Sequence, residues 1–292
     1  MRSDPADFEM LVAKSLDDAV TLLAREPGAW LPIAGGTDVM VLYGAGTLRA
    51  RRLLSIRNLR ELGGIAETPS EVTIGAGCTY SELRRSEVLA REFPLLARAA
   101  SWTGGIANQN RGTLGGNIAN ASPAADSLPA LLAYDAEVIL ASVRGERRVA
   151  YREFHLGYKQ TAMAGDELIR AIGLPRKFAG YFAHARKVGA RQAQAIAKVA
   201  VAGLGLVNDG VIHDVRIALG SVAPVPLRLE KLEATLIGNK CGAISVQHLR
   251  KWVAESIAPI GDIRSTAEYR GAVAGNLVAE FVAQLCASEV RA

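Results

Sequence analysis

The segment from Gly112 to Asp126 constrains the fold of this chain more than any other stretch. It reads GTLGGNIANASPAAD, in which adjacent glycines are followed by small apolar residues and short polar side chains. Consecutive glycines let a backbone approach a phosphate closely and direct its N–H groups at the oxygens. The polar side chains suit a pyrophosphate and then ribityl or ribose hydroxyls. We call this stretch the second glycine segment; the alternative is a compact loop whose Asn and Ser side chains bond their own backbone.

A first glycine segment precedes it in the chain and consists of Ala34, Gly35, Gly36, Thr37 and Asp38. It follows a short extended run that begins at Trp30, and apolar residues 39–43 after it fit the first turns of a helix. A glycine turn that leads into a helix N-terminus favours a bound anion. Taken alone, a plain turn between a strand and a helix explains the same residues.

Other kinds of chemical site have no signature in this sequence. There is no G-x-G-x-x-G that opens a βαβ unit, no P-loop and no G-x-S-x-G nucleophile elbow. The four histidines are scattered without the spacing of metal ligands. The three cysteines, Cys78, Cys241 and Cys286, are widely spaced. We therefore expect no disulfide, no structural zinc, no iron–sulfur cluster held by this chain alone, and no other metal site.

The charge of the chain gives no indication of a nucleic-acid partner. Lys and Arg number 34 against 29 Asp and Glu, and the excess is not gathered in one region. The aromatic fraction of 5% leaves few rings for base stacking. A basic group of Arg186, Lys187, Arg191 and Lys198 fits either a solvated strand edge or a position beside an anionic ligand. The acidic N-terminal residues and the lack of a long uncharged apolar stretch predict a cytoplasmic chain without a membrane span.

The order of predicted elements indicates a mixed chain of about two domains, as its 292 residues suggest. Ser15 with Asp18, Thr79 with Glu82 and Ser265 with Glu268 are candidate capping boxes, and residues 127–135 have helical character. Strands are expected at 53–56, 72–78, 137–142, 149–154 and 167–174, and a hairpin at 195–222 around Asp209-Gly210. We divide the chain into residues 1–177, with parts of about 1–57 and 58–177, and residues 178–292.

In their order and separation, the two glycine segments resemble those of the FAD-binding medium subunit of the molybdenum hydroxylases. This is the family of xanthine dehydrogenase, carbon monoxide dehydrogenase and 4-hydroxybenzoyl-CoA reductase. Residues Gly157 to Thr161, Lys187 to Val199 and Asp262 to Arg270 also resemble family landmarks. The resemblance spans nearly the whole chain. It implies the α+β class, with a two-part FAD domain of the vanillyl-alcohol-oxidase (PCMH) type and a C-terminal domain of antiparallel sheet and helices.

The resemblance also assigns roles to individual residues, with FAD held non-covalently. Backbone N–H groups of both segments are expected to bind the FAD pyrophosphate, from Ala34, Gly35, Gly36, Thr37, Asp38, Thr113, Leu114, Gly115, Gly116 and Asn117. Side chains of Asn120, Ser122 and Asp126 are expected to bond the diphosphate, ribityl or ribose groups. Lys187 is expected near the isoalloxazine, where a cation stabilises the reduced, anionic flavin. Which of Thr37 and Asp38 contacts phosphate stays open.

The implied function is that of an electron-transfer subunit in a larger complex. A molybdopterin subunit would oxidise the substrate, an iron–sulfur subunit would relay electrons, and FAD on this chain would pass them to an external acceptor, in a dimer of heterotrimers. Two alternatives stay open: a stand-alone FAD-dependent oxidoreductase of the same fold, and a non-catalytic nucleotide-binding module. The sequence names neither the substrate of the complex nor the acceptor.

Overall fold

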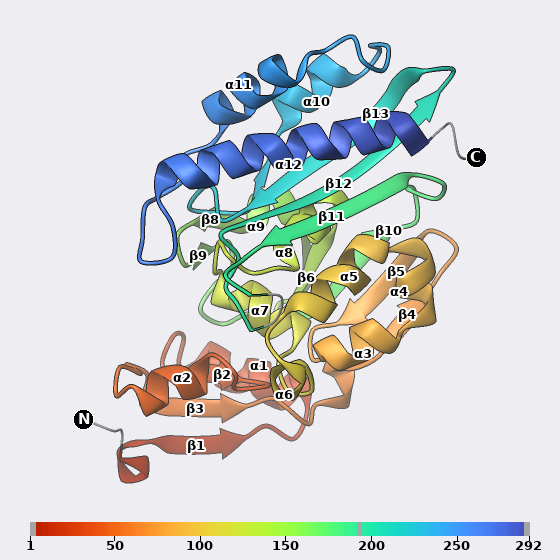
Figure 1. Cartoon of the computed structure of the whole chain (residues 1–292). Coiled ribbons are helices and arrows are strands. Elements are labelled where there is room, and N and C mark those ends of the chain that lie inside the picture. The colour runs from red at the N-terminus through yellow and green to blue at the C-terminus, as the bar shows by residue number, and fades with distance from the viewer. Residues whose placement is uncertain (1–3, 192–193, 289–292) are drawn as a thin grey trace.

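The computed structural model describes residues 4–191 and 194–288, which form three main sheets (Figure 1). The N-terminal sheet is parallel, with the order β1 (Glu9–Val12), β3 (Arg52–Ser55), β2 (Leu31–Ile33). Helices α1 (Leu16–Arg25) and α2 (Val39–Gly44) connect its strands, and short 3-10 turns lie at Pro5–Asp7 and Arg60–Leu62. This is the small α/β unit that the sequence predicts before residue 57.

A five-stranded antiparallel sheet follows, with the order β4 (Ile65–Glu67), β5 (Glu71–Gly75), β10 (Leu168–Pro175), β6 (Glu137–Ser142), β7 (Gly145–Ala150). Its apolar face shares one buried core with residues from the helices between β5 and β6. These helices are α3 (Tyr80–Arg85), α4 (Glu87–Glu92), α5 (Pro94–Trp102), α6 (Ile106–Gln109), α7 (Leu114–Asn120) and α8 (Leu128–Ala133). Helix α9 (Tyr151–Phe154) and a small hairpin, β8 (His155–Gly157) with β9 (Gln160–Thr161), precede β10.

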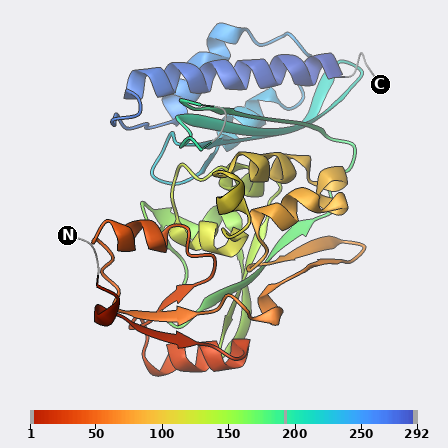
Figure 2. The ribbon, with the colours of Figure 1, turned by 60° about the horizontal axis from the view of Figure 1, so that its bottom comes forward.

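The C-terminal part is a four-stranded antiparallel sheet, β11 (Phe182–Val188), β12 (Val199–Asn208), β13 (Val211–Gly220) and β14 (Leu227–Arg228). Helices α10 (Glu230–Leu236), α11 (Val246–Ser256) and α12 (Ala267–Ser288) complete it at the end of the molecule opposite the N-terminal sheet (Figures 1 and 2). The predicted hairpin around Asp209-Gly210 is confirmed, and so is the antiparallel sheet with helices.

Both faces of this sheet are buried, which fixes the C-terminal part on the rest. Helix α12 lies along one face, where Gly203 and Gly205 leave room for the side chains of Phe281 and Leu285. An added Cβ at Gly203 would come within 2.6 Å of the Phe281 ring. Helix α8 contacts β12 and β13 from the other side. By length and composition α12 could cross a membrane, and 44% of its apolar window is buried inside the structure.

An ion-pair cluster around Asp135 also joins the two parts. The Asp135 carboxylate lies 2.8 Å from Lys177 Nζ and 3.0 Å from Arg216 Nη1, and it also binds Arg228. Burial raises the pKa of Asp135, but these cations outweigh burial and hold the pKa below its ordinary value. A cleft of about 510 Å³ opens beside the cluster. Because its cations, Lys177, Arg152, Arg216 and Arg228, each have an acidic partner, the cleft offers no uncompensated positive charge.

The structure corrects two local predictions. The strand expected at 149–154 ends at Ala150, and Tyr151–Phe154 forms α9, because the Tyr151 and Phe154 rings are buried in the core and stack on each other. The long helix is capped one residue later than predicted. Thr266 Oγ1 accepts from the Tyr269 N–H, whereas Ser265 pairs with Asp262 in a tight turn. The capping box of Thr79 and Glu82 is confirmed.

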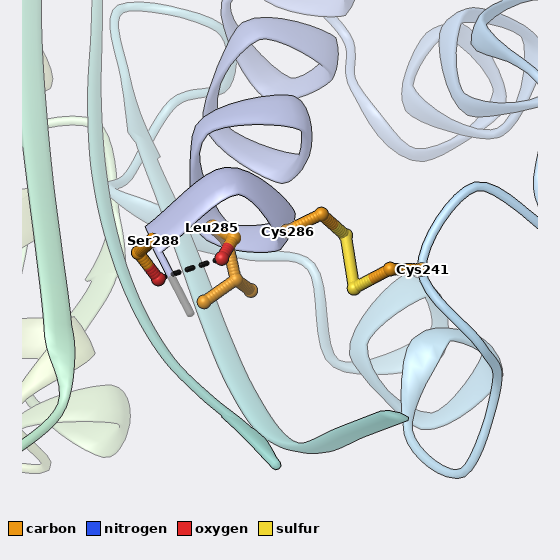
Figure 3. The surroundings of a disulfide bond; sticks show 4 residues. All are labelled: Cys241, Leu285, Cys286 and Ser288. Carbon is orange, nitrogen blue, oxygen red and sulfur yellow. Dashed lines mark hydrogen bonds between the residues drawn. A yellow bond between two sulfur atoms is a disulfide. The ribbon is translucent and has the colours of Figure 1, made fainter. Parts of the chain in front are cut away.

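The expectation of no disulfide is wrong. Cys241 and Cys286 are bonded, with their Cα atoms 5.5 Å apart (Figure 3). Cys286 lies in the last turn of α12 and Cys241 in the loop after α10, which the packing of α11 on α12 brings together. The two residues are 45 positions apart, so spacing along the chain gave no signal of their contact.

His155 makes the stability of this fold sensitive to acid. Burial lowers its pKa to about 4, and its Nε2 lies 3.0 Å from the Tyr151 hydroxyl. An unfolded histidine titrates near pH 6.5, so between about pH 6.5 and 4 the unfolded chain binds more protons than the folded one. We expect the free energy of unfolding to fall by about 3 kcal/mol over this range from His155 alone. Urea unfolding of wild type and His155→Gln at pH 7 and pH 4 measures this term, and parallel pH dependences would contradict it.

Candidate functional site

Three segments converge where the first glycine segment meets the start of α7. The first segment connects β2 to α2, the second begins just before α7, and the turn of the β8–β9 hairpin lies beside both. Gly35 packs so closely on the start of the second segment that an added Cβ would lie 3.0 Å from Gly112 Cα and 1.9 Å from the carbonyl oxygen of the preceding Arg111. Only glycine fits there. The structure thus brings together the two segments that the sequence singled out.

The first glycine segment presents free backbone donors. Within residues 4–191 and 194–288, the N–H groups of Gly35, Gly36, Thr37 and Asp38 have no hydrogen-bond acceptor. Gly36 has φ +76°, a left-handed conformation that glycine adopts without strain. Asp38 precedes α2 but makes no side-chain cap to it. Such a run of unpaired N–H groups suits an anion.

The second glycine segment uses its N–H groups differently. Leu114 and Gly115 donate to the carbonyls of Cys78 and Ala76, at 2.9 and 2.8 Å. Thr113 caps α7, accepting from the Gly116 N–H with Oγ1 at 3.1 Å and from the Asn117 N–H with its carbonyl at 3.0 Å. These four N–H groups are therefore occupied within the chain. They fix the start of α7 against the β5–α3 connection.

The second segment offers a ligand open space at Gly116 and polar side chains that can still form hydrogen bonds. Gly116 is exposed, and an added Cβ would meet only Thr113 Oγ1, at 2.8 Å. Asn117 accepts from Ser127 Oγ with its Oδ1 at 2.9 Å, which leaves its Nδ2 as a donor. Ser127 is fully buried and also bonds the Tyr80 hydroxyl, at 3.1 Å. This buried chain of polar groups holds the Asn117 amide in one orientation.

The remaining predicted residues of the two segments have more local surroundings. Ala34 follows β2 and is half-buried. The Leu114 side chain is completely buried in the core. Ser122 Oγ accepts from the Ala124 N–H at 3.4 Å within its own turn. Asn120, at the end of α7, donates to the Asp38 carboxylate at 2.9 Å and so links the two segments directly.

Asp126 and Lys187, which the sequence analysis assigned separately, form a buried ion pair. Asp126 Oδ2 lies 2.7 Å from Lys187 Nζ, and both side chains are 7% exposed. Lys187 is on β11 and Asp126 is just before α8, so the pair spans the junction with the C-terminal part. Burial raises the pKa of Asp126 to about 6, partly offset by Lys187. Its second oxygen, Oδ1, is buried without any hydrogen-bond donor among the described residues.

That orphaned oxygen is the test of whether a flavin nucleotide fits here. A buried acceptor without a donor is costly unless a ligand supplies one. The ribityl hydroxyls and ring N–H of a flavin are such donors, and a diphosphate needs the donors of the first segment. The residues present fit the flavin and the diphosphate of FAD.

The basic group of the sequence analysis does not form one cluster. Arg186 pairs with Glu280, Arg191 donates to the Gln194 carbonyl, and Lys198 lies over the Tyr269 ring, 5.1 Å from its centroid. Residues 192 and 193 of the run from Lys187 to Val199 lie outside the described residues. Only Lys187 of this group has a buried charge.

One residue at the site was missed by the sequence analysis. Lys159, in the β8–β9 turn, donates to Asn120 O at 2.7 Å and to Asn120 Oδ1 at 2.6 Å. The sequence gave it only as part of a family landmark. A lysine in a two-strand turn carries no signal of its distant contacts.

Comparisons with known proteins agree with this geometry. The family described as FAD binding domain in molybdopterin dehydrogenase matches residues 6–177, and the CO dehydrogenase flavoprotein C-terminal domain matches residues 184–285. The chain is 33% identical to a xanthine dehydrogenase FAD-binding subunit of Escherichia coli O157:H7, over 88% of this chain and 89% of that one. It is 31% identical to the carbon monoxide dehydrogenase medium chain of Hydrogenophaga pseudoflava, over 94% and 95% of the two chains.

Solved structures show the same similarity. A reconstituted CO dehydrogenase from Oligotropha carboxidovorans superposes with a TM-score of 0.92 at 28% identity, covering 98% of this chain and 99% of that one. A CO dehydrogenase from Hydrogenophaga pseudoflava gives a TM-score of 0.90 at 31% identity, covering 95% and 96%. The similarity therefore extends over both parts of the chain and over nearly all of each relative.

Proposed function

Because this chain belongs to the family of FAD-binding medium subunits of the multi-subunit molybdenum hydroxylases, we propose that the first glycine segment binds the FAD diphosphate and Asp126 orients the flavin end. The chain is thus an oxidoreductase subunit, and its complex contains iron–sulfur clusters and a molybdenum cofactor in partner subunits. The observation that carries the proposal is the convergence of both segments, with four unpaired N–H groups in the first.

The first segment supplies the donors to phosphate in this proposal. The N–H groups from Gly35 to Asp38 donate to no acceptor among the described residues, so they are available to a bound diphosphate. Of the two polar side chains, Asp38 is already bound by Asn120 and carries a negative charge. The Thr37 hydroxyl is neutral and can donate a hydrogen bond. It lies on the side of the second segment, where a Cβ built on Gly112 would be 3.4 Å from Thr37 Oγ1. We assign the phosphate contact to Thr37.

The second segment supplies shape and orientation. Gly116 leaves the surface of α7 bare of a side chain, so that a diphosphate can lie against it. The side-chain amides of Asn117 and Asn120 add hydrogen-bond donors along one face of α7. They lie about one and two turns after its first residue. Asp126 Oδ1 accepts a hydrogen bond from the ribityl group or from the ring N–H. FAD, when bound, supplies reversible two-electron chemistry, and these residues hold it and exclude water from it.

The buried pair of Asp126 and Lys187 is proposed to set the reduction potential of the flavin. A cation a few ångströms from the ring favours the anionic reduced form by about 1–4 kcal/mol, which is about 20–90 mV for two electrons. We expect Lys187→Met to lower the potential and Asp126→Asn to raise it, because the two charges act in opposite directions. Redox titration of the flavin absorbance measures both variants. A potential that neither variant moves would place the pair away from the ring.

The electron path requires partners, as membership of this family implies. We propose that a small iron–sulfur subunit passes electrons to FAD on this chain, that a large molybdopterin subunit oxidises the substrate, and that FAD gives the electrons to an external acceptor. A cytoplasmic dimer of heterotrimers is the assembly we propose. We also propose the domain division at residues 1–177 and 178–292, which the separate sheets support.

FAD is proposed to be held without a covalent bond. Neither glycine segment contains His or Cys, the residues that usually form the linkage to flavin. Acid precipitation of the purified yellow chain should therefore leave the flavin in the supernatant, where its absorbance and phosphodiesterase sensitivity identify it as FAD. A yellow pellet would contradict non-covalent binding. The proposed function itself would be contradicted if the chain were purified without flavin and also failed to take up added FAD.

A further inference from the structure

We propose that Lys159 is the positioning residue that neutralises Asp38 and thereby keeps the first glycine segment able to accept the FAD diphosphate. This inference rests on the proposed function and adds a residue to it. The observation behind it is a chain of contacts between three separate segments, Lys159 to Asn120 to Asp38.

The contacts leave Asn120 one orientation. Lys159 Nζ has only donors, so it must face the Asn120 oxygens, at 2.6 Å for Oδ1 and 2.7 Å for the main-chain carbonyl. The Asn120 Nδ2 group then faces Asp38 and donates to its Oδ1 at 2.9 Å. The Asn120 amide thus lies between the Lys159 ammonium group and the Asp38 carboxylate. Its oxygen faces the cation and its NH2 group faces the carboxylate. Lys159, Asn120 and Asp38 therefore form one continuous chain of hydrogen bonds.

The electrostatics of the site require such a cation. Asp38 belongs to the segment whose N–H groups are free, so its carboxylate lies close to any anion that binds there. Two like charges at this range repel each other, and because Asp38 and Lys159 are both exposed, solvent screens part of the repulsion. Burial lowers the pKa of Lys159, while the Asp38 carboxylate acts in the opposite direction. The structural link between the two charges is the Asn120 amide, which bonds both.

The hairpin that carries Lys159 is built to hold it there. Lys159 has φ +58°, a left-handed conformation that non-glycine residues seldom adopt. The hairpin is tied to the core by the buried Phe154 and His155, and Ala162 N–H donates to the Phe154 carbonyl at 2.8 Å. Residues in such conformations persist where their surroundings fix them, and they are common at ligand sites.

A different role for Lys159 predicts a different result, which allows a sharp test. Its bond to the Asn120 carbonyl also caps the end of α7. If capping were its whole contribution, the charge of Asp38 would not matter. If Lys159 acts by neutralising Asp38, removing that carboxylate must remove the need for the lysine. A double-mutant cycle measures this coupling.

The experiment uses the full chain freed of flavin and titrated with FAD, whose fluorescence reports binding. Lys159→Met should raise the Kd for FAD by about tenfold or more, and Lys159→Arg should restore most of the affinity. Asp38→Asn should lower the Kd, and in that background Lys159→Met should change it less than about threefold. Lys251→Met, on the exposed face of α11, controls for loss of a remote charge.

Each outcome decides the matter. An equal loss of affinity from Lys159→Met in both Asp38 backgrounds would assign Lys159 to capping alone and overturn the proposal, as would an unchanged Kd. If Lys159→Met does not fold, Lys159→Arg and Asp38→Asn still test it, because a carboxylate that opposes the anion must weaken binding in the wild type. A wild-type chain that binds no FAD would instead refute the proposed function.

Discussion

Gly116→Val is expected to give a folded protein that has lost its flavin. The wild-type glycine is exposed, and a Cβ added there lies 2.8 Å from Thr113 Oγ1, which must shift and loosen its cap on α7; apart from this shift the chain itself has room for valine. The FAD diphosphate does not, because the branched side chain fills the surface of α7 against which it is proposed to lie. We expect the Kd for FAD to rise by at least about 100-fold, the equivalent of about 3 kcal/mol.

The measurement is flavin content per purified chain, followed by titration with FAD and by circular dichroism to establish the fold. Gly44→Val is the matched control, since Gly44 is the last residue of α2, the helix that follows the first glycine segment, and an added Cβ there contacts nothing within 4 Å. It should keep its flavin. Full flavin occupancy in a folded Gly116→Val protein would show that the diphosphate lies elsewhere.

The isolated chain should contain flavin but no stoichiometric iron or molybdenum, and it should not oxidise any heterocycle, aldehyde or carbon monoxide. Within the described residues, no group of three His, Cys, Asp or Glu side chains could hold a metal ion. Cys241 and Cys286 are bonded to each other, and Cys78 is buried. Burial raises the pKa of the Cys78 thiol to about 11, which disfavours the thiolate that would bind metal.

Metal analysis by mass spectrometry and a turnover assay on the chain alone test this expectation. Adding the iron–sulfur and molybdopterin subunits should bring turnover from the background rate to that of the complex. Substrate oxidation by the chain without partners would favour the alternative of a self-sufficient flavoenzyme.

The features that the sequence predicted correctly are those whose cause is local. The capping box at Thr79 needs only residues three apart, and the hairpin at Asp209-Gly210 needs only a turn between two apolar runs. Both glycine segments were found for the same reason, because adjacent glycines allow tight turns and close backbone approach wherever they occur. Their convergence came from the family resemblance and not from the pattern itself.

What the sequence did not predict depends on contacts between distant residues. The N–H groups of Leu114 and Gly115 are occupied by the β5–α3 connection, and nothing near them in the sequence indicates this. Asp126 and Lys187 lie 61 positions apart, so their pairing follows only from tertiary packing, in which β11 contacts α5 and α8 contacts β12 and β13. Lys159 reaches Asn120 across 39 positions. The same limit explains the missed disulfide between Cys241 and Cys286.

That disulfide encloses α11 and most of α12 in a covalent ring. Closing a ring of this size removes conformational freedom from the unfolded chain, by about 4 kcal/mol in the chain-entropy description. A cut in the backbone between α11 and α12 would leave the two pieces joined until a reductant acts. Since a disulfide persists only where the surroundings are sufficiently oxidising, the heat resistance of the C-terminal helices becomes a function of the redox state of the compartment in which the protein resides.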